Sequence, residues 1–192
     1  LFRMYMTKMK MKRQTLILIL IAIGINPDNA KSFQGHGPNL GYAVSSEEIA
    51  AWDTSVFPDG EGLPKGEGSA QTGEVLYKSR CIMCHGKNGL GTATGVQLAG
   101  AQLDLTSEYP EQTIGSYWPY ATTLFDVIRR SMPMTAPGSL SDDEVYALTA
   151  YLLFLNNIID EYEVMDASKL AKVRMPNEGG FINIYKIEET LR

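Results

Sequence analysis

The sequence of 192 residues predicts an all-α domain, and three helical segments carry this prediction. Residues 69–80 begin with Ser69, a residue type that caps helix N-termini. Residues 123–131 end shortly before Pro133, because the residue that precedes a proline disfavours helical backbone. Residues 141–155 open with the capping box Ser141-Asp142-Asp143-Glu144. An apolar stripe at helical spacing follows that box, made of Val145, Leu148, Leu152 and Leu155, with Tyr151 beside it.

The first of these helices carries a glycine in its interior. Gly73 costs about 1 kcal/mol there relative to alanine. Close approach of another helix would compensate for that cost, and Tyr77 lies one turn further on the same face. The spacing therefore predicts a small–aromatic face on residues 69–80. In the helix at 123–131, we expect Leu124, Phe125 and Ile128 to point inward.

The motif Cys81-Ile82-Met83-Cys84-His85 follows the first helix directly. This C-x-x-C-H pattern is the attachment signature of c-type haem. The two thiols form thioether bonds with the porphyrin vinyl groups, and the histidine becomes the proximal axial ligand of the iron. Cys81 and Cys84 are the only cysteines of the chain, and His85 is one of two histidines. We therefore predict one covalently bound haem c.

Two other chemistries of paired cysteines fit the sequence less well. A thioredoxin-like dithiol requires a βαβ setting, and no alternation of strand and helix patterns surrounds Cys81. A structural zinc ion needs four nitrogen or sulfur ligands. Such a site would use every cysteine and histidine of the chain, namely Cys81, Cys84, His85 and His36.

Residues 1–30 are interpreted as a signal peptide of the Sec type. Lys8, Lys10, Lys12 and Arg13 are positive, and an apolar run from Leu16 to Ile25 follows them. That run suits a signal peptide and is shorter than the roughly 20 residues of a membrane helix. The prediction is a periplasmic protein with no membrane span after cleavage. The cleavage position is left open, and an uncleaved anchor is the alternative.

The charge of the chain argues against nucleic acid as a partner. The formal net charge is −5, and it becomes more negative without residues 1–30, which hold five Lys and Arg residues and one Asp. An acidic protein is repelled by phosphate backbones and attracted over a long range to basic surfaces. No nucleic-acid partner is therefore expected.

The remaining residues divide by composition into three parts. Residues 31–68 are a Gly/Pro-rich arm with one short helical piece, Ser46 to Trp52, in which Ile49 and Trp52 lie three residues apart. Either this arm packs on a surface, its own or a partner's, or it is a flexible leader. Residues 69–160 are predicted to be the monohaem domain, and residues 161–192 a C-terminal tail.

A helix with a small–aromatic face, followed at once by C-x-x-C-H, and a C-terminal helix with an aromatic on its stripe resemble the class I cytochromes c. The resemblance implies that these two helices cross at the small–aromatic contact. It also implies a distal methionine in a Met-Pro pair after the third helix, a position that Met132-Pro133 matches. From the residues alone, Met134 and His36 remain alternatives for this sixth ligand.

The same resemblance implies a loop that bounds the haem pocket. The family has a Gly-Pro-x-Leu segment whose proline carbonyl accepts a hydrogen bond from the proximal imidazole. The corresponding residues here are Gly95-Val96-Gln97-Leu98. Since Val96 stands in the place of the proline, its carbonyl is available for the bond and the loop loses rigidity.

Further candidates for contacts with the haem lie just before and within the third helix. In the cluster Tyr117-Trp118-Pro119-Tyr120, the polar tips of Trp118 and Tyr120 can reach a haem edge or propionate. Packing of the loop on the core is the alternative. Arg129 is a candidate partner for a propionate, and together with Arg130 for a docking patch, against the alternative of a solvated helix end.

Several segments resemble one group of cytochromes in particular, the cytochrome subunit (D subunit) of the Sox sulfane dehydrogenase and the related sulfite dehydrogenase cytochromes. These segments are Glu48–Asp53, Pro58–Gly60, Gly62–Pro64, Gly115–Asp126, Met132-Pro133, Ala136–Leu140 and Arg174–Asn177. The resemblance implies electron transfer from a molybdenum-cofactor subunit of the sulfite oxidase type to a downstream cytochrome or oxidase. The best-known members carry two haems, whereas this chain has one C-x-x-C-H motif. A freely diffusing electron shuttle and a haem enzyme with an open distal site are the alternatives.

Overall fold

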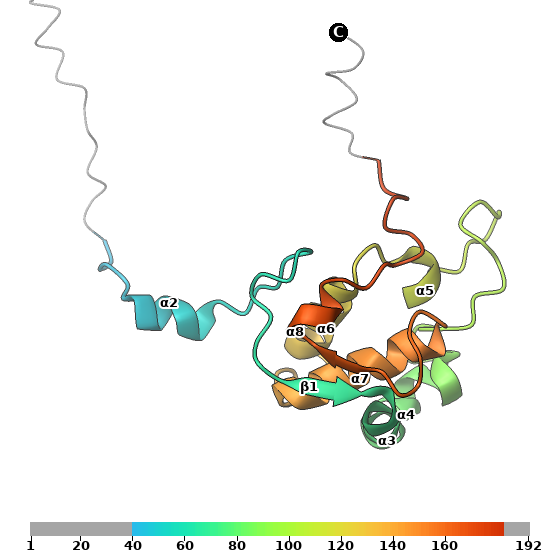
Figure 1. Ribbon diagram of the computed structural model, residues 1–192, viewed down its shortest axis with the longest axis horizontal. Helices are drawn as coiled ribbons and strands as arrows, with labels where there is room; N and C mark the ends of the chain where they lie inside the picture. The colour runs from blue at the N-terminus through green and yellow to red at the C-terminus, as the bar shows by residue number, and fades with distance from the viewer. Residues whose placement is uncertain (1–39, 183–192) are drawn as a thin grey trace, which may run out of the picture. The chain divides into compact units, whose positions relative to one another are not determined.

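The computed structural model describes residues 40–182, which are mainly helical (Figure 1). The predicted signal peptide and His36 lie outside the described residues. The chain divides into two units, residues 1–45 and residues 46–192, and the fold described below is that of the second. Its elements, in chain order, are α2 (Ser46–Trp52), β1 (Glu67–Ser69), α3 (Ala70–Arg80), α4 (Ile82–His85), η2 (Lys87–Gly89), α5 (Ile114–Tyr117), α6 (Ala121–Ser131), α7 (Asp142–Leu155), β2 (Val164–Asp166) and α8 (Ala167–Leu170).

The local sequence signals place the ends of the main helices. The Ser69 hydroxyl accepts a hydrogen bond from the Thr72 amide at 3.2 Å and starts α3. At the start of α7, the Ser141 hydroxyl accepts from the Glu144 amide at 3.2 Å, and the Glu144 carboxylate accepts from the Ser141 amide at 2.9 Å. This reciprocal pair is the predicted capping box. Helix α6 begins at Ala121, two residues before the predicted start.

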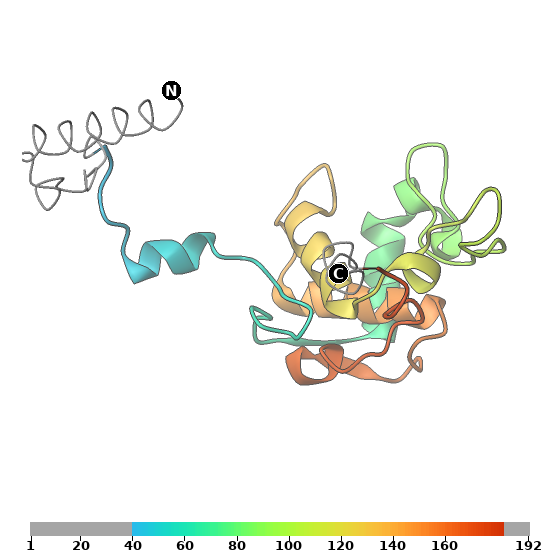
Figure 2. The same ribbon diagram turned by 90° about the horizontal axis from the view of Figure 1, so that it is seen from above.

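Helix α7 forms the centre of the core, and α3 and α6 both cross it (Figure 2). All of its residues from Val145 to Leu153 are buried, so the helix is covered on every side and not only along the predicted stripe. On α6, the three side chains expected to point inward, Leu124, Phe125 and Ile128, are buried.

Two glycines allow α7 to come close to the preceding segment. A Cβ on Gly73 would lie 1.9 Å from the Ala147 carbonyl oxygen, and a Cβ on Gly68 would lie 2.2 Å from the Ala147 nitrogen. One turn beyond Gly73, the rings of Tyr77 and Tyr151 pack with their centroids 5.3 Å apart. The predicted small–aromatic contact between these helices is therefore present.

The segment after residue 160 belongs to the packed domain. Strand β2 pairs with β1 in an antiparallel ladder that joins Glu67 to Asp166 and Ser69 to Val164. Met165, Leu170 and Met175 are buried in the same core as α7. The all-α prediction is thus confirmed for the bulk of the domain, with one two-stranded sheet added among the described residues, and the expected tail contributes to the core.

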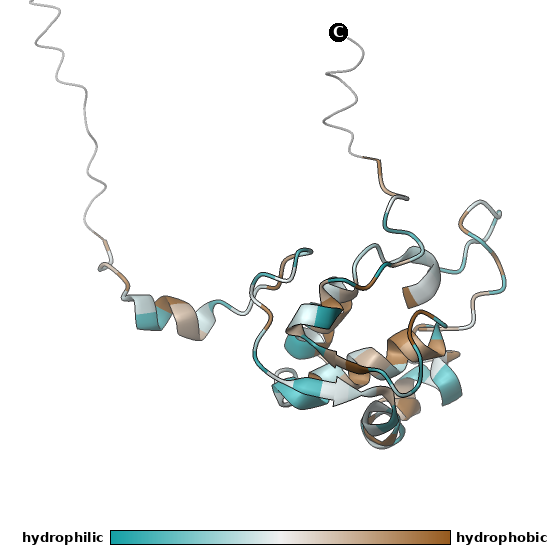
Figure 3. Cartoon of the chain, viewed as in Figure 1, coloured by the Kyte–Doolittle hydropathy of each residue, from teal (hydrophilic) through white to brown (hydrophobic). Residues whose placement is uncertain are grey.

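The last part of the N-terminal arm is also attached to the domain. The Thr122 hydroxyl donates a hydrogen bond to the Pro58 carbonyl at 3.3 Å, and the Tyr146 hydroxyl donates to the Pro64 carbonyl at 2.8 Å. Val56 and Leu63 pack against the core. Helix α2 has no buried residue, although its ribbon carries apolar residues (Figure 3).

Within residues 40–182, no helix has both the length and the apolar character needed to cross a membrane.

Candidate haem site

One helical turn brings the three residues of the C-x-x-C-H motif together. Helix α3 ends at Arg80, and the Cys81 amide still donates to the Tyr77 carbonyl at 2.9 Å. The next turn is closed by a bond of 2.9 Å from the His85 amide to the Cys81 carbonyl. Both thiols are free, with Cys81 partly buried and Cys84 exposed. The two sulfur atoms and the imidazole are therefore presented from a single short segment.

Burial raises the pKa of the Cys81 thiol to about 11, although the charge of Arg80 acts in the opposite direction. At neutral pH this sulfur is therefore a thiol and not a thiolate, because desolvation disfavours the charged form. In a c-type cytochrome, Cys81 would hold the porphyrin through a thioether bond between this sulfur and a vinyl group.

The orientation of the His85 ring is set by the loop that follows the motif. His85 Nδ1 lies 2.9 Å from the Val96 carbonyl oxygen. Since a carbonyl oxygen can only accept, Nδ1 carries the proton, and Nε2 is left with the lone pair that a metal binds. The expected bond from the imidazole is thus made by the carbonyl of Val96 even though this residue is not a proline. Such a bond fixes the tautomer of a metal-binding histidine and raises its basicity.

Several hydrogen bonds hold the loop between His85 and Val96 against the motif. The Tyr77 hydroxyl donates to the Gly86 carbonyl at 2.8 Å, and the Thr92 hydroxyl donates to the Cys84 carbonyl at 2.5 Å. A Cβ on Gly95 would lie 2.4 Å from that same Cys84 oxygen, so only glycine fits there. The roles of Thr92 and of the Tyr77 hydroxyl were missed from the sequence, because a side-chain bond to a backbone carbonyl leaves no spacing pattern.

Met132 lies at the C-terminal end of α6. Its amide donates to the Ile128 carbonyl at 3.1 Å, and its partly buried side chain packs against the core. By contrast, Met134 is 79% exposed and Met83 is 86% exposed. Of these three methionines, Met132 alone has a side chain held by the protein interior. It remains our prediction for the distal ligand, with Met134 the less favoured alternative.

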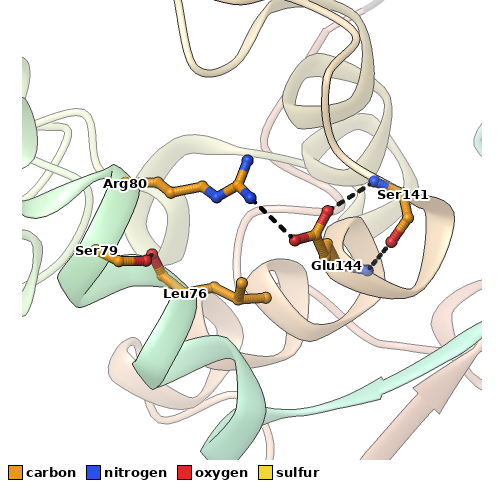
Figure 4. A network of polar contacts seen from close by, with 5 residues as sticks. All are labelled: Leu76, Ser79, Arg80, Ser141 and Glu144. Carbon is orange, nitrogen blue, oxygen red and sulfur yellow. Dashed lines mark hydrogen bonds and ion pairs between the residues drawn. The ribbon is translucent and has the colours of Figure 1, made fainter.

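The segment that carries the proximal ligand is tied to the first turn of α7 (Figure 4). The guanidinium of Arg80, the residue before Cys81, lies 3.4 Å from a carboxylate oxygen of Glu144. The other oxygen of Glu144 accepts from the Ser141 amide, as described above. A single side chain therefore caps α7 and binds the end of α3.

Arg129 pairs with the same turn of α7. Its Nε lies 3.0 Å from Asp142 Oδ1. Its neighbour Arg130 pairs within α6 with the buried carboxylate of Asp126. Both arginines proposed for a propionate or a docking patch thus have carboxylate partners in this structure. Sequence reasoning missed the pairing of Arg129 because Asp142 already had a local explanation as part of a helix cap.

The aromatic segment before α6 is covered by the end of the described chain. The Asn177 side-chain amide donates to the Tyr117 carbonyl at 2.7 Å, and the ring of Phe181 meets that of Tyr117 edge to face at 5.3 Å. Trp118 is partly buried and packs against the core, whereas Tyr120 is 36% exposed and precedes α6 as its N-cap. Packing against the core thus explains the position of the Trp118 side chain. A contact of Trp118 or Tyr120 with haem remains a prediction.

These residues fit a c-type haem. Two free thiols, an imidazole with its metal-binding nitrogen fixed, and a loop whose glycine leaves no room for a side chain against Cys84 are the donor set and support that such a group requires. Cys81 and Cys84 would hold the porphyrin, and His85 and Met132 would ligate the iron.

Comparison with known proteins agrees with this reading of the site. The sequence profile of the family described as Cytochrome c matches residues 70–156. A chain in the crystal structure of the sulfane dehydrogenase SoxCD from Paracoccus pantotrophus is 40% identical, with a TM-score of 0.73. The match covers 80% of this chain and 75% of that one.

A thiosulfate dehydrogenase from Allochromatium vinosum is 31% identical over 99 residues, which are 49% of this chain. The match spans only 36% of the length of that relative.

Proposed function

Because the chain belongs to the cytochrome c family, whose cofactor is covalently bound haem c, we propose that it is the single-haem electron-transfer subunit of a periplasmic sulfur-compound dehydrogenase. Its electron donor in this proposal is a molybdenum-cofactor subunit of the sulfite oxidase type. Its acceptor is a second cytochrome or an oxidase.

The observation that carries this proposal is the extent of the likeness to a SoxCD chain. The match has 40% sequence identity and covers 80% of the present chain. It therefore includes more residues than the 87 matched by the general family profile. The additional matched residues lie outside residues 70–156, in segments that the general family profile does not include. The segment before residue 70 includes α2, which has no buried residue and is suited to recognising a partner.

Within this function, the haem supplies one-electron storage and transfer, and the protein supplies binding and orientation. Cys81 and Cys84 fix the position of the group, and the Val96 carbonyl orients His85 as its ligand. The thioether of Met132, placed at the end of α6, favours the reduced iron in the manner typical of Met/His ligation. No described residue is assigned to bond-making chemistry on a substrate.

The test is to purify the protein from its native source without dissociating its complexes. We expect the haem protein to co-elute with a subunit that contains molybdenum, measured by metal analysis of the fractions. Addition of sulfite, thiosulfate or a protein-bound sulfane should then reduce the haem, followed by its visible spectrum. A haem protein that always elutes free of molybdenum would support the diffusing shuttle instead.

A further inference from the structure

The N-terminal arm carries an apolar surface that the described part of the chain does not cover. Ile49 and Trp52 lie three residues apart on α2 and therefore share one face of the helix. They are 55% and 86% exposed. We call these two side chains the arm face. A tryptophan this exposed is unusual, since it is a residue that folding normally buries to a large extent.

The arm face is attached to the haem domain by a short tether. Val56 already packs against the core, and the Pro58 carbonyl is bonded to Thr122 of α6. Only the three residues from Asp53 to Ser55 separate the end of α2 from this anchored segment. Three extended residues span at most about 11 Å. A protein that binds Trp52 is therefore held against the haem domain and close to it.

The chemistry around the arm face selects the kind of partner. Residues 40–64 contain five carboxylates, Glu47, Glu48, Asp53, Asp59 and Glu61, and no lysine or arginine. Apolar side chains in such a segment are complementary to an apolar groove with a basic rim. The same carboxylates are repelled by the negative surface of an anionic membrane, which makes a lipid surface a poor occupant.

The likeness to SoxCD reaches into this arm. The match covers 80% of the present chain, which is more than residues 58–192 contain. Part of the match must therefore lie within residues 1–57. A chain solved as part of SoxCD thus has a counterpart to part of this N-terminal region, where the core fold of the cytochrome family, matched from residue 70 on, has none.

We propose that the arm face docks in an apolar groove with a basic rim on the molybdenum subunit of the complex. This inference rests on the proposed function and specifies the surface through which the two subunits recognise each other. Trp52 is the anchor, because large aromatic side chains at the centre of an interface contribute most to binding. The tether to α6 then holds the partner next to the domain that contains Met132.

The experiment measures binding of the full-length holoprotein to the molybdenum subunit purified from the same source, by isothermal titration calorimetry. Trp52→Ala is expected to weaken the affinity by at least about tenfold. Tyr162→Ala is the matched control, since Tyr162 is an aromatic residue with 76% exposure outside the arm, and its affinity should equal that of the wild type. The affinity of the wild type should also fall as salt is raised, because the complementary charges are exposed. Visible spectra of all variants report whether the haem site is intact.

The outcomes separate the inference from the proposed function. If the wild type binds the molybdenum subunit and Trp52→Ala binds equally well, the docking surface is wrong and the proposed function stands. If the wild type does not bind a molybdenum subunit, the proposed function fails, and the inference fails with it. Dimerisation of the wild type that Trp52→Ala abolishes, seen by sedimentation, would assign the arm face to a second copy of this chain and overturn the inference. The inference would also be overturned if the wild type bound anionic vesicles as tightly as the molybdenum subunit and Trp52→Ala lost that binding to vesicles.

Discussion

Arg129 Nε lies 3.0 Å from Asp142 Oδ1, which joins the end of α6 to the first turn of α7. Arg80 binds Glu144 in that same turn. The first of these arginines stands three residues before Met132, and the second stands immediately before Cys81. The first turn of α7 is therefore the common anchor of the two segments that carry the predicted distal and proximal ligands.

The anchor should affect ligation more than overall stability. Arg129→Gln is expected to lower the free energy of unfolding by less than about 1 kcal/mol, because a partly exposed ion pair contributes little. We expect it to free the end of α6 and to increase the fraction of ferrous haem that binds carbon monoxide. Arg174→Gln serves as the control, because it breaks an ion pair with Glu178 in a segment that carries neither predicted ligand. Equal carbon monoxide binding in the two variants would contradict this role.

The distal ligand can be assigned by comparing two methionines that are close in sequence. Met132→Ala should abolish the long-wavelength absorption band of a methionine–ferric iron bond and allow ferrous haem to bind carbon monoxide. Met134→Ala should leave both properties unchanged, because that side chain is 79% exposed. The reverse pattern would move the assignment to Met134, and an unchanged spectrum in both variants would exclude this loop as the ligand source.

The contact between α3 and α7 should tolerate no side chain at residue 73. In Gly73→Ala, the new Cβ would meet the Ala147 carbonyl oxygen at 1.9 Å, and the backbone must move. We expect a loss of about 3 kcal/mol in the free energy of unfolding, measured by urea denaturation. Gly179→Ala is the matched control, since a Cβ there has nothing within 4 Å. Similar stabilities of the two variants would show that the helices can separate without cost.

The segment after residue 160 should be required for stability. Leu170 is 1% exposed, and Leu170→Ala is expected to destabilise the protein by about 2–5 kcal/mol. The exposed neighbour Lys172 supplies the control, with an expected change within about 0.5 kcal/mol for Lys172→Ala. Thermal unfolding followed by circular dichroism measures both. A small effect of Leu170→Ala would mean that the tail is not part of the cooperative unit.

Two buried tyrosines should make the fold sensitive to alkali. Burial raises the pKa of Tyr77 and of Tyr146 from 10.0 to about 12. The hydroxyls lose their protons at a higher pH in the native state than in the unfolded state. Their contribution to the free energy of unfolding is therefore fully present below pH 10 and falls as the pH rises toward 12. Tyr77→Phe should show a shallower fall in urea-unfolding stability over this range. An identical slope in the variant and the wild type would exclude Tyr77 as a source of the alkaline sensitivity.

The sequence predicted the elements whose signals are local. The capping box at Ser141 and the small–aromatic pair Gly73 and Tyr77 are set by residues within one or two turns, and all are present in the structure. The hydrogen bond from His85 to the Val96 carbonyl was also anticipated, because a backbone carbonyl does not depend on residue type.

Features that depend on distant partners were not predicted. Strands β1 and β2 have three residues each, and their sequences, Glu67-Gly68-Ser69 and Val164-Met165-Asp166, are too short to show alternation. The predicted domain ended at residue 160, so buried residues such as Met165 were assigned to the tail. The pairing of Arg129 with Asp142 likewise depends on how two helices pack, which composition cannot reveal.

The pairing of β1 with β2 also affects the order in which the protein matures. A chain that is made from its N-terminus presents Cys81 and Cys84 before α7 exists to pack on α3, and long before β2 can pair with β1. Residues as late as Met175 complete the core. The attachment turn is therefore accessible before the core around it is complete. Closure of the domain comes last, so attachment of the haem can precede the packing of α3 on α7.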